Sequence, residues 1–130
     1  MKLDQKVVAL IKERSFAHVA MLDSDGFPHV TPVWVDTDGE RIIINTAIGR
    51  KKQRLATVGT PVSVEISNPS NPYSYVLVKG RVAEQTERGA EEHINRMALK
   101  YTGNGQYQKS SPGERRVLIY IEPLKVIGSL

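Results

Sequence analysis

A run of cations in the middle of the chain is the strongest chemical signal in this sequence. Residues 45–55 read NTAIGRKKQRL, with four basic side chains within five positions. The chain has 18 basic and 14 acidic residues, so these four equal its whole formal net charge of +4. An excess gathered at one predicted strand-to-helix junction indicates a localised anion site rather than a generally basic surface.

The turn before this run favours phosphate as the anion. Thr46 and Gly49 lead from a predicted strand into a short predicted helix that ends near Gly59, and free N–H groups at a helix start attract anions. Arg50 and Lys51 add full charges. A solvated helix face is one alternative. A nucleic-acid patch is another, but sequence-tolerant binders interleave aromatic and basic residues, and no aromatic residue lies between positions 34 and 73.

The strand predicted just before the cation run could hold a flat heterocycle. Thr31, Pro32, Val33 and Trp34 bring together a hydroxyl, an unpaired stretch of backbone and a large aromatic side chain. Proline cannot donate to a β-ladder and is confined to edges and bulges, so the backbone at Pro32 is unpaired or bent. The alternative for Trp34 is packing in the core.

Other reactive sets are missing from the sequence. His18, His29 and His93 lie on separate predicted elements, which disfavours a metal site. The chain has no cysteine, which excludes disulfides, thiolate metal sites and a cysteine nucleophile. Neither GxGxxG nor GxxxxGK occurs, so a Rossmann or P-loop phosphate site is excluded. No catalytic residue can be named, and a bound cofactor is expected to supply any reactivity.

Alternation of apolar and polar residues predicts the strands that carry these groups. The predicted strands are 16–23, 29–35, 41–46, 62–66, 73–83, 117–121 and 125–127. The first three are predicted to form an antiparallel meander, and the last two to be separated by a break at Pro123. Gly80 is expected to bend the long strand, as happens in sheets that curve into barrels.

Two amphipathic helices are predicted, one before the first strand and one between the strands at 73–83 and 117–121. Asp4 is the expected N-cap of the first, whose apolar residues at positions 3, 7, 10 and 11 share one face. The second spans Thr86–Tyr101 and ends before Gly103. A polar loop at 102–114 follows, in which Tyr107 could serve as an anchor.

The size and composition predict one domain, residues 1–130, with 40% hydrophobic residues available for a core. Short antiparallel strands with two to three helices in the connections predict a mainly β fold, a barrel with peripheral helices. No stretch is long and apolar enough for a signal peptide or membrane span. A cytoplasmic protein that does not interact with membranes is the expectation.

The order of these parts resembles the flavin and deazaflavin split-barrel proteins of the pyridoxamine 5'-phosphate oxidase-like class, over nearly the whole chain. The matching segments are GFPHVTPVW at 26–34, NTAIGRK at 45–51 with Leu55, YSYVLVKGRV at 73–82, EEHI at 91–94, KYTG at 100–103 and PGERR at 112–116. The last blocks resemble the bacterial subgroup that uses the deazaflavin coenzyme F420.

The resemblance implies a six-stranded antiparallel split β-barrel of Greek-key order, and a homodimer with two cofactor sites at the subunit interface. The implied cofactor-binding residues are Thr31, Pro32, Val33, Trp34, Val35, Asn45, Thr46, Gly49, Arg50, Lys51, Tyr73 and Tyr75. Residues 31–35 would line the ring, residues 46–51 would hold the phosphate, and the two tyrosines would approach from the partner chain.

The sequence departs from the family pattern in two places. Lys52-Gln53-Arg54 stands where x-Arg-Asn is frequent, so no role for Lys52 or Arg54 carries over. The C-terminal Arg-x-His of true pyridoxamine-phosphate oxidases is absent, since residues 125–127 read KVI. Pyridoxamine phosphate is therefore not the expected substrate.

Three functions follow from the resemblance. The first is an F420-dependent reductase that transfers a hydride between C5 of the cofactor and an unsaturated small-molecule substrate. The phosphodiester of this coenzyme carries an oligoglutamate tail, and four clustered cations exceed what one phosphate needs. The second is an FMN-dependent oxidoreductase of the same fold. The third is a non-catalytic protein that binds or stores a flavin or deazaflavin, because fold does not imply function.

Overall fold

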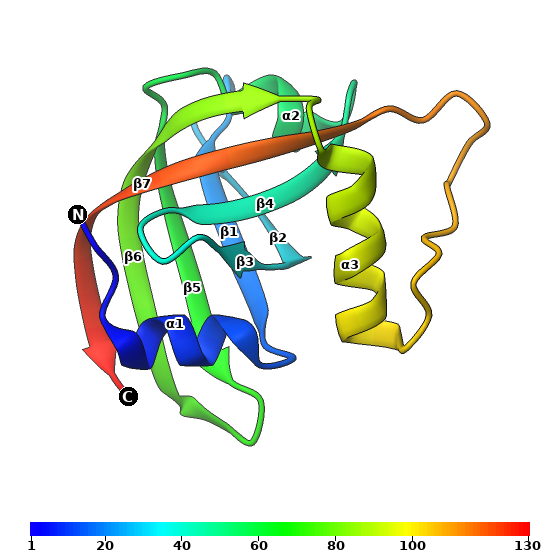
Figure 1. Ribbon diagram of the computed structural model, residues 1–130. Coiled ribbons are helices and arrows are strands. Elements are labelled where there is room, and N and C mark those ends of the chain that lie inside the picture. Colours follow the sequence, from blue (N-terminus) through cyan, green and yellow to red (C-terminus); the bar gives the residue numbers. More distant parts are fainter.

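A computed structural model describes residues 1–130, apart from the side chain of Ser129 (Figure 1). Its elements in chain order are α1 (Gln5–Lys12), β1 (Phe16–Leu22), β2 (Pro28–Trp34), β3 (Asp36–Thr37), β4 (Ile42–Ala47), α2 (Lys51–Leu55), β5 (Pro61–Asn68), β6 (Asn71–Thr86), α3 (Ala90–Thr102) and β7 (Arg116–Ser129). No described helix is long and apolar enough to cross a membrane.

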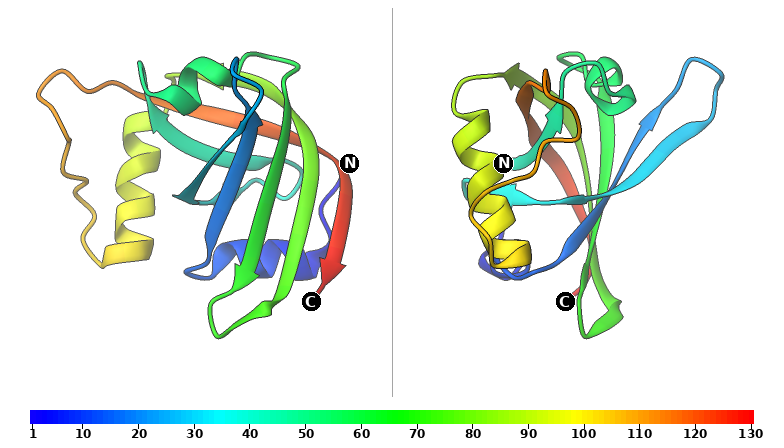
Figure 2. Two further views of the ribbon diagram at one scale, coloured as in Figure 1. Left: turned by 180° about the vertical axis from the view of Figure 1, so that it is seen from behind. Right: turned by 90° about the vertical axis from the view of Figure 1, so that its right-hand side faces the viewer.

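All seven strands join one antiparallel sheet in the order β2-β1-β5-β6-β7-β4-β3. The sheet curls into a half-barrel, with α1 across one end and α3 beside the β4 edge (Figures 1 and 2). This confirms the predicted split barrel with two to three peripheral helices, of which there are three, but the sheet has seven strands where six were expected. The seventh strand is the two-residue β3, which is too short to leave an alternating pattern in the sequence.

The predicted meander is wrong in its third strand. β2 pairs with β1, but β4 pairs with β7 and β3 at the other side of the sheet. β7 offers β4 a continuous register from Ile42↔Ile121 to Ala47↔Arg116, so that the apolar residues of both strands enter the core. β2, which contains Pro32, remains at the edge, as proline requires.

The long pairing of β6 with β7 bends at Gly80, which confirms the predicted bend. The register shifts between Lys79 and Gly80, where Gly80 lies opposite Pro123. A Cβ atom on Gly80 would lie 2.3 Å from the carbonyl oxygen of Glu122, so only glycine permits this approach. The predicted break at Pro123 is wrong, because the shift absorbs the proline and β7 continues.

The predicted start of the second long helix is also wrong. Thr86 is the last residue of β6 and pairs with Leu118, and α3 begins only at Ala90. Gly89, in the left-handed region with φ of 76°, turns the chain between them. The β6–β7 ladder therefore overrides the helical pattern of residues 86–89, which is a tertiary effect on a local propensity.

The core lies between the concave face of the sheet and α1. The apolar face of α1 is buried as predicted, and Asp4 caps the helix by accepting a hydrogen bond from the backbone N–H of Lys6 at 2.7 Å. The fully buried side chains of the barrel include Val19, Ile42, Ile44, Val64, Ile66, Val78 and Ile121. This packing fixes the strands that position the candidate site.

Candidate functional site

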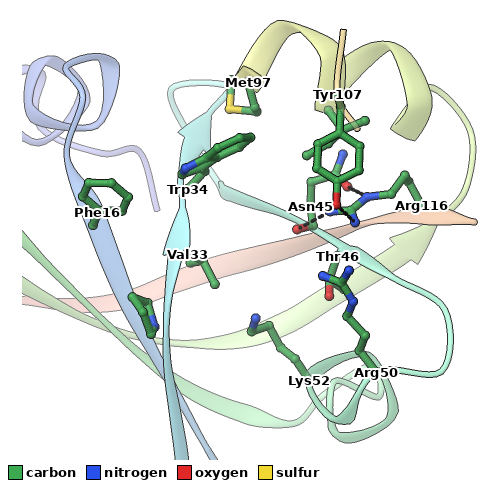
Figure 3. Close-up of a pocket in the computed structure, with 12 residues that line it drawn as sticks. Phe16, Val33, Trp34, Asn45, Thr46, Arg50, Lys52, Met97, Tyr107 and Arg116 are labelled. Atoms are coloured by element: carbon green, nitrogen blue, oxygen red, sulfur yellow. Dashed lines mark hydrogen bonds between the residues drawn. The ribbon is translucent and has the colours of Figure 1, made fainter. Parts of the chain in front are cut away.

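The site lies where the sheet fails to close. β2 has a free outer edge, and β4 pairs with β3 only at Ile42 and Ile43, so its later residues have no strand beside them on that side. A pocket of about 280 Å³ occupies this gap (Figure 3). Its lining residues are Phe16, Pro32, Val33, Trp34, Asn45, Thr46, Arg50, Lys52, Ile94, Met97, Tyr107 and Arg116.

The β2 side of the pocket is apolar and aromatic. Val33 and Trp34 lie on this side in Figure 3, with Phe16 of β1 and Met97 of α3 nearby. The indole of Trp34 stacks on the ring of Tyr101, with centroids 5.1 Å apart and planes at 3°. Such a surface buries the face of a planar molecule through contact area.

The position of Tyr101 fixes this stack. Its hydroxyl accepts a hydrogen bond from the backbone N–H of Val35 at 3.2 Å and donates to the carbonyl of Ser15. The tyrosine therefore ties α3 to the ends of β1 and β2. Trp34 is half-buried against Tyr101. One face of the indole packs inward, as in the alternative of core packing, but the side chain also lines the pocket.

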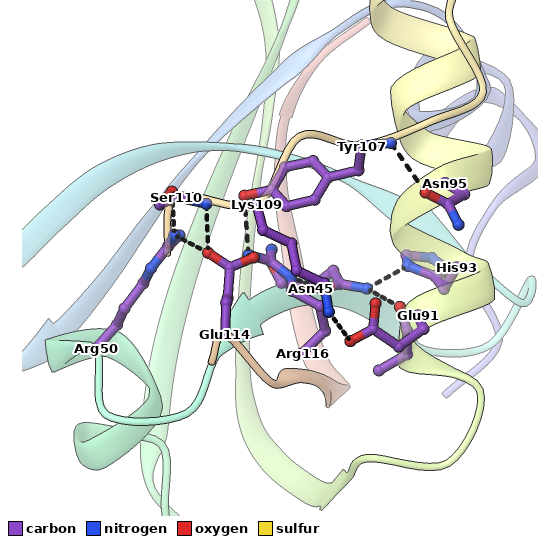
Figure 4. A network of polar contacts seen from close by, with 11 residues as sticks. Asn45, Arg50, Glu91, His93, Asn95, Tyr107, Lys109, Ser110, Glu114 and Arg116 are labelled. Carbon is purple, nitrogen blue, oxygen red and sulfur yellow. Dashed lines mark hydrogen bonds and ion pairs between the residues drawn. The ribbon is translucent and has the colours of Figure 1, made fainter. Parts of the chain in front are cut away.

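The β4 side is polar and centres on a buried arginine (Figure 4). Nε of Arg116 donates to Oδ1 of Asn45 at 2.9 Å, and Nη1 donates to the hydroxyl of Tyr107 and to Oε2 of Glu114, each at 3.2 Å. The other oxygen of Glu114 accepts from Arg50 at 3.1 Å. Burial raises the pKa of Glu114, but its hydrogen bond from the Ser110 N–H and the two guanidinium groups outweigh this and lower it.

The network continues beneath the pocket. Nδ2 of Asn45 lies 3.0 Å from Nδ1 of His93, and Nε2 of His93 lies 3.0 Å from Oδ2 of Asp36. Nζ of Lys12 donates to Oδ1 of Asp36 at 3.0 Å. Burial raises the pKa of Asp36, but the hydrogen bonds from His93, Lys12 and the Thr37 backbone outweigh it, so the pKa lies well below its ordinary value of 3.8.

The cation run divides between two sides of the short helix α2. Lys51 points away from the pocket and pairs with Asp23 at 2.6 Å, and this hydrogen bond lowers the pKa of Asp23. Lys52 is half-buried and lines the pocket, and its ammonium group has no hydrogen bond or ion pair with any described residue. Burial, followed by the charges of Arg50 and Arg116, lowers the pKa of Lys52.

An anion in the pocket would provide a partner for both Lys52 and Thr46. The cationic Lys52 lacks a counter-ion among the described residues, and it faces the same cavity as Arg50 and Arg116. Oγ1 of Thr46 is buried without a hydrogen-bond partner in the part of the chain that the structure describes. Buried polar groups without a partner are uncommon in proteins, and an acceptor oxygen of an anion would suit this hydroxyl. A phosphate-bearing planar cofactor therefore fits both sides of the pocket.

Six of the residues predicted from the sequence lie together in the pocket: Pro32, Val33, Trp34, Asn45, Thr46 and Arg50. The other six lie outside its lining. Thr31 of β2 has a hydroxyl that is also buried without a described partner, and Val35, which directly follows β2, is fully buried. The N–H of Gly49 donates to the side-chain oxygen of Gln53. Lys51 pairs with Asp23, as described above.

The remaining two, Tyr73 and Tyr75, lie at the start of β6 and are not among the residues that line the pocket. Both are exposed, Tyr73 to 88%. Within one chain they do not approach the site. Their predicted role was through a partner chain, and it stays a prediction.

Six lining residues were not predicted: Phe16, Lys52, Ile94, Met97, Tyr107 and Arg116. Tyr107 was expected only to anchor its loop, which its N–H does by donating to Oδ1 of Asn95 at 2.9 Å. The signal for Arg116 is its place directly before the continuous apolar run 117–121, where a buried charged residue needs a partner. Lys52 is conspicuous in the sequence by its charge. The sequence does not show which side of a five-residue helix faces the pocket, so Lys52 could not be distinguished from its neighbours.

Comparison with known proteins agrees with this geometry. A family model described as pyridoxamine 5'-phosphate oxidase matches residues 4–126. A solved structure described as an F420 reductase is similar with a TM-score of 0.78 and 23% identity, over 96% of this chain and 98% of that chain. Group A Streptococcus HupZ is similar with a TM-score of 0.66 and 18% identity, over 95% and 91% of the two chains.

A further solved structure, the FAD and heme binding protein from Mycobacterium smegmatis, has a TM-score of 0.64 and 14% identity, over 94% of this chain and 67% of that chain. No curated protein matches the sequence significantly. At these identities the structural likenesses establish the fold. The family match over nearly the whole chain, together with the curled antiparallel sheet, shows that this protein belongs to the pyridoxamine 5'-phosphate oxidase family of split-barrel proteins.

Proposed function

We propose that this protein is an oxidoreductase that binds the deazaflavin coenzyme F420 in the gap between β2 and β4. The observation that carries the proposal is that one pocket combines an aromatic side with a cation, Lys52, that has no ion pair with a described residue. The twelve lining residues include no carboxylate, histidine or cysteine, and Lys52, the one amine among them, is assigned to the anion rather than to catalysis. The reactivity is then the cofactor's own.

When bound, the cofactor supplies hydride transfer at C5 of its ring to an unsaturated small molecule. The protein's part is to hold and orient the ring and to exclude water from one of its faces. Val33 and Trp34 provide contact with the ring, while Lys52 and Thr46 provide charge and a hydroxyl for the phosphate. Arg54, which is exposed on α2 and has no ion pair with a described residue, would meet an acidic tail.

FMN is the second candidate, and the ion pairs favour it. Of the four clustered cations, Lys51 pairs with Asp23 and Arg50 with Glu114. The cation that lacks a described partner inside the pocket is Lys52, and one lysine matches one phosphate. The pocket cation without an ion pair to a described residue therefore matches the single phosphate of FMN. This weakens the argument from the sequence that the four clustered cations bind an acidic tail.

Titration of the purified protein with both cofactors tests the proposal. Tighter binding of F420 than of FMN by about tenfold or more, a difference of about 1.4 kcal/mol, is the expected result. Tighter FMN binding would select the second candidate. Very weak, equal binding of both would refute both. Oxidation of reduced cofactor by a panel of conjugated carbonyl compounds then separates an enzyme from a storage protein.

The outer face of the sheet supports a homodimer as part of the proposal. Leu22 and Val30 are 68% and 55% exposed on the β1–β2 hairpin, which projects on the side away from α3 (Figure 2). Tyr75 on β6 and Ile127 on β7, which follow β5 in the same sheet, are exposed as well. A second copy covering this surface would remove apolar area from water. Analytical ultracentrifugation of wild type and Val30→Lys tests it: a wild-type monomer, or an unchanged dimer in the variant, would count against it.

A further inference from the structure

The side-chain amide of Asn45 commits nearly all of its hydrogen-bonding capacity inside the protein. Nδ2 lies 2.9 Å from the carbonyl of Ala90 and 3.0 Å from Nδ1 of His93, and Oδ1 accepts from Arg116 at 2.9 Å (Figure 4). An amide has two N–H donors and two oxygen lone pairs. One lone pair on Oδ1 is all that remains. Since Asn45 lines the pocket, the group it can offer to a bound molecule is an acceptor.

The neighbours of Asn45 fix this orientation. The carbonyl of Ala90 can only accept, and the Nε of Arg116 can only donate, so a reversed amide would make two repulsive contacts. Because Nδ2 then faces His93, Nδ1 of the imidazole must accept. The ring proton is therefore on Nε2, which lies 3.0 Å from Oδ2 of Asp36, an acceptor. Each assignment follows from the one before it.

His93 and the carboxylate of Asp36 are both buried and held in place. His93 is 3% exposed and Asp36 is 6% exposed. Asp36 also accepts from Lys12 at 3.0 Å, which fixes the carboxylate from the α1 side. A second-layer carboxylate that orients an imidazole is a common arrangement at metal sites. Here the imidazole orients an amide instead.

We propose that Asp36 and His93 form a positioning pair that keeps Asn45 an acceptor at the pocket, so that the site selects a molecule with an N–H or O–H donor at that point. The inference rests on the proposed function. In a flavin or deazaflavin nucleotide, two groups supply such a donor: the ring N–H between its two carbonyls, and the hydroxyls of the chain that links ring to phosphate. Neither Asp36 nor His93 lines the pocket, so their effect is through Asn45.

The probe for the test is 5-deaza-FMN, which has a deazaflavin ring and a single phosphate. Two analogues separate the sources of the donor: one with the ring N–H methylated, and one with a hydroxyl-free five-carbon linker. Wild type should bind at least one analogue about tenfold more weakly than the parent, the size expected for one lost hydrogen bond. Binding of 5-deaza-FMN with no discrimination would overturn the inference and leave the proposed function standing. No binding of the parent would refute the proposed function.

Variants of His93 distinguish positioning from a general structural role. His93→Leu should lower the discrimination without abolishing it, because Asn45 loses one of the two acceptors of its Nδ2 but keeps the Ala90 carbonyl and Arg116. His93→Gln should retain it, since the glutamine amide can accept from Asn45 and donate to Asp36. Equal discrimination in a folded His93→Leu variant would overturn the role of His93. If that variant does not fold, Asn45→Ala, which removes the acceptor, should abolish the discrimination, and its persistence would overturn the proposal.

A ligand-free measurement tests the same chain of hydrogen bonds. The ¹⁵N chemical shifts of the His93 ring report which nitrogen carries the proton. We expect a neutral ring protonated at Nε2 in wild type, and loss of this single form in Asn45→Ala. A ring protonated at Nδ1 in wild type would overturn the inference, because His93 could not then accept from Asn45.

Discussion

The two sides of the pocket are built in different ways. On the β4 side, Asn45 and Arg116 are each bonded to several fixed partners, and the network extends from Arg50 to Lys12. On the β2 side, Val33 and Trp34 contribute contact surface only. Buried charge needs a complete set of partners, whereas apolar contact tolerates change. We infer that the hydrogen-bonded network of the β4 side is rigid and that the apolar β2 side is adaptable.

The largest effect is expected from breaking the polar side at its centre. Arg116→Met should lower the free energy of unfolding by about 3 kcal/mol, because it leaves Glu114 and the amide oxygen of Asn45 buried without their main partner. Urea denaturation followed by circular dichroism measures this. Arg115→Met is the matched control, since Arg115 is exposed and pairs with Glu87 at the surface. Equal losses in the two variants would contradict a special role for the buried network.

The second-largest effect is expected at Lys52, and it distinguishes this residue from its neighbour Lys51. Lys52→Ala should weaken binding of FMN or F420 by about 2 kcal/mol, the range for a hydrogen bond to a charged group. Lys51→Ala should change affinity by less than about twofold, because Lys51 faces Asp23 at the surface. Isothermal titration calorimetry compares the two neighbours directly. A larger loss for Lys51→Ala would restore the assignment predicted from the sequence.

A smaller effect is expected on the apolar side, and it should not depend on phosphate. Trp34→Ala should weaken binding by about 1.5 kcal/mol, and equally for FMN and riboflavin, because it removes only ring contact. Of these two ligands, Lys52→Ala should weaken the binding of FMN and leave the binding of riboflavin unchanged. Fluorescence titration with both ligands separates the two sides, with Phe27→Ala, an exposed aromatic outside the pocket, as the control. Identical ligand dependence in the Trp34 and Lys52 variants would remove the distinction between the sides.

The smallest effect concerns the far end of the polar network at acid pH. The pKa of Asp36 is lower in the folded protein than its ordinary 3.8, so below about pH 4 the unfolded chain binds more protons than the folded one. The stabilisation is present above that pH and is lost as the pH falls. The loss due to Asp36 should reach about 1 kcal/mol at pH 3. Urea denaturation at pH 7 and pH 3 should show a smaller acid loss in Asp36→Asn, and an unchanged loss would contradict the assignment.

The sequence predicts three lining residues on each side of the pocket, but those on the apolar side rest on signals that are local in the sequence. Pro32 indicates an edge by its chemistry alone, and Trp34 stands out as the single tryptophan of the chain. Both signals are local. Because proline is confined to edges and bulges, Pro32 indicates an edge strand without any knowledge of the strand that pairs with it.

The polar side depends on pairings that are distant in sequence. Asn45 and Arg116 meet only because β4 pairs with β7, and His93 reaches Asn45 from α3. The predicted meander placed β4 beside β2, which would have closed the gap that holds the pocket. Lys51 and Lys52 are equivalent by type, and the rotation of α2 that separates them is set by packing rather than by local pattern.

Pro32 has a consequence for how binding specificity can change. The β1–β2 register is continuous from Phe16↔Trp34 to Leu22↔Pro28, so the missing N–H of Pro32 faces the outer edge of β2. That edge cannot form a complete ladder with another strand, and the gap persists whatever side chains line it. The shape of the pocket is thus a property of the backbone, while its chemistry is a property of replaceable side chains. A lineage can exchange one ligand for another here without first having to open a cavity.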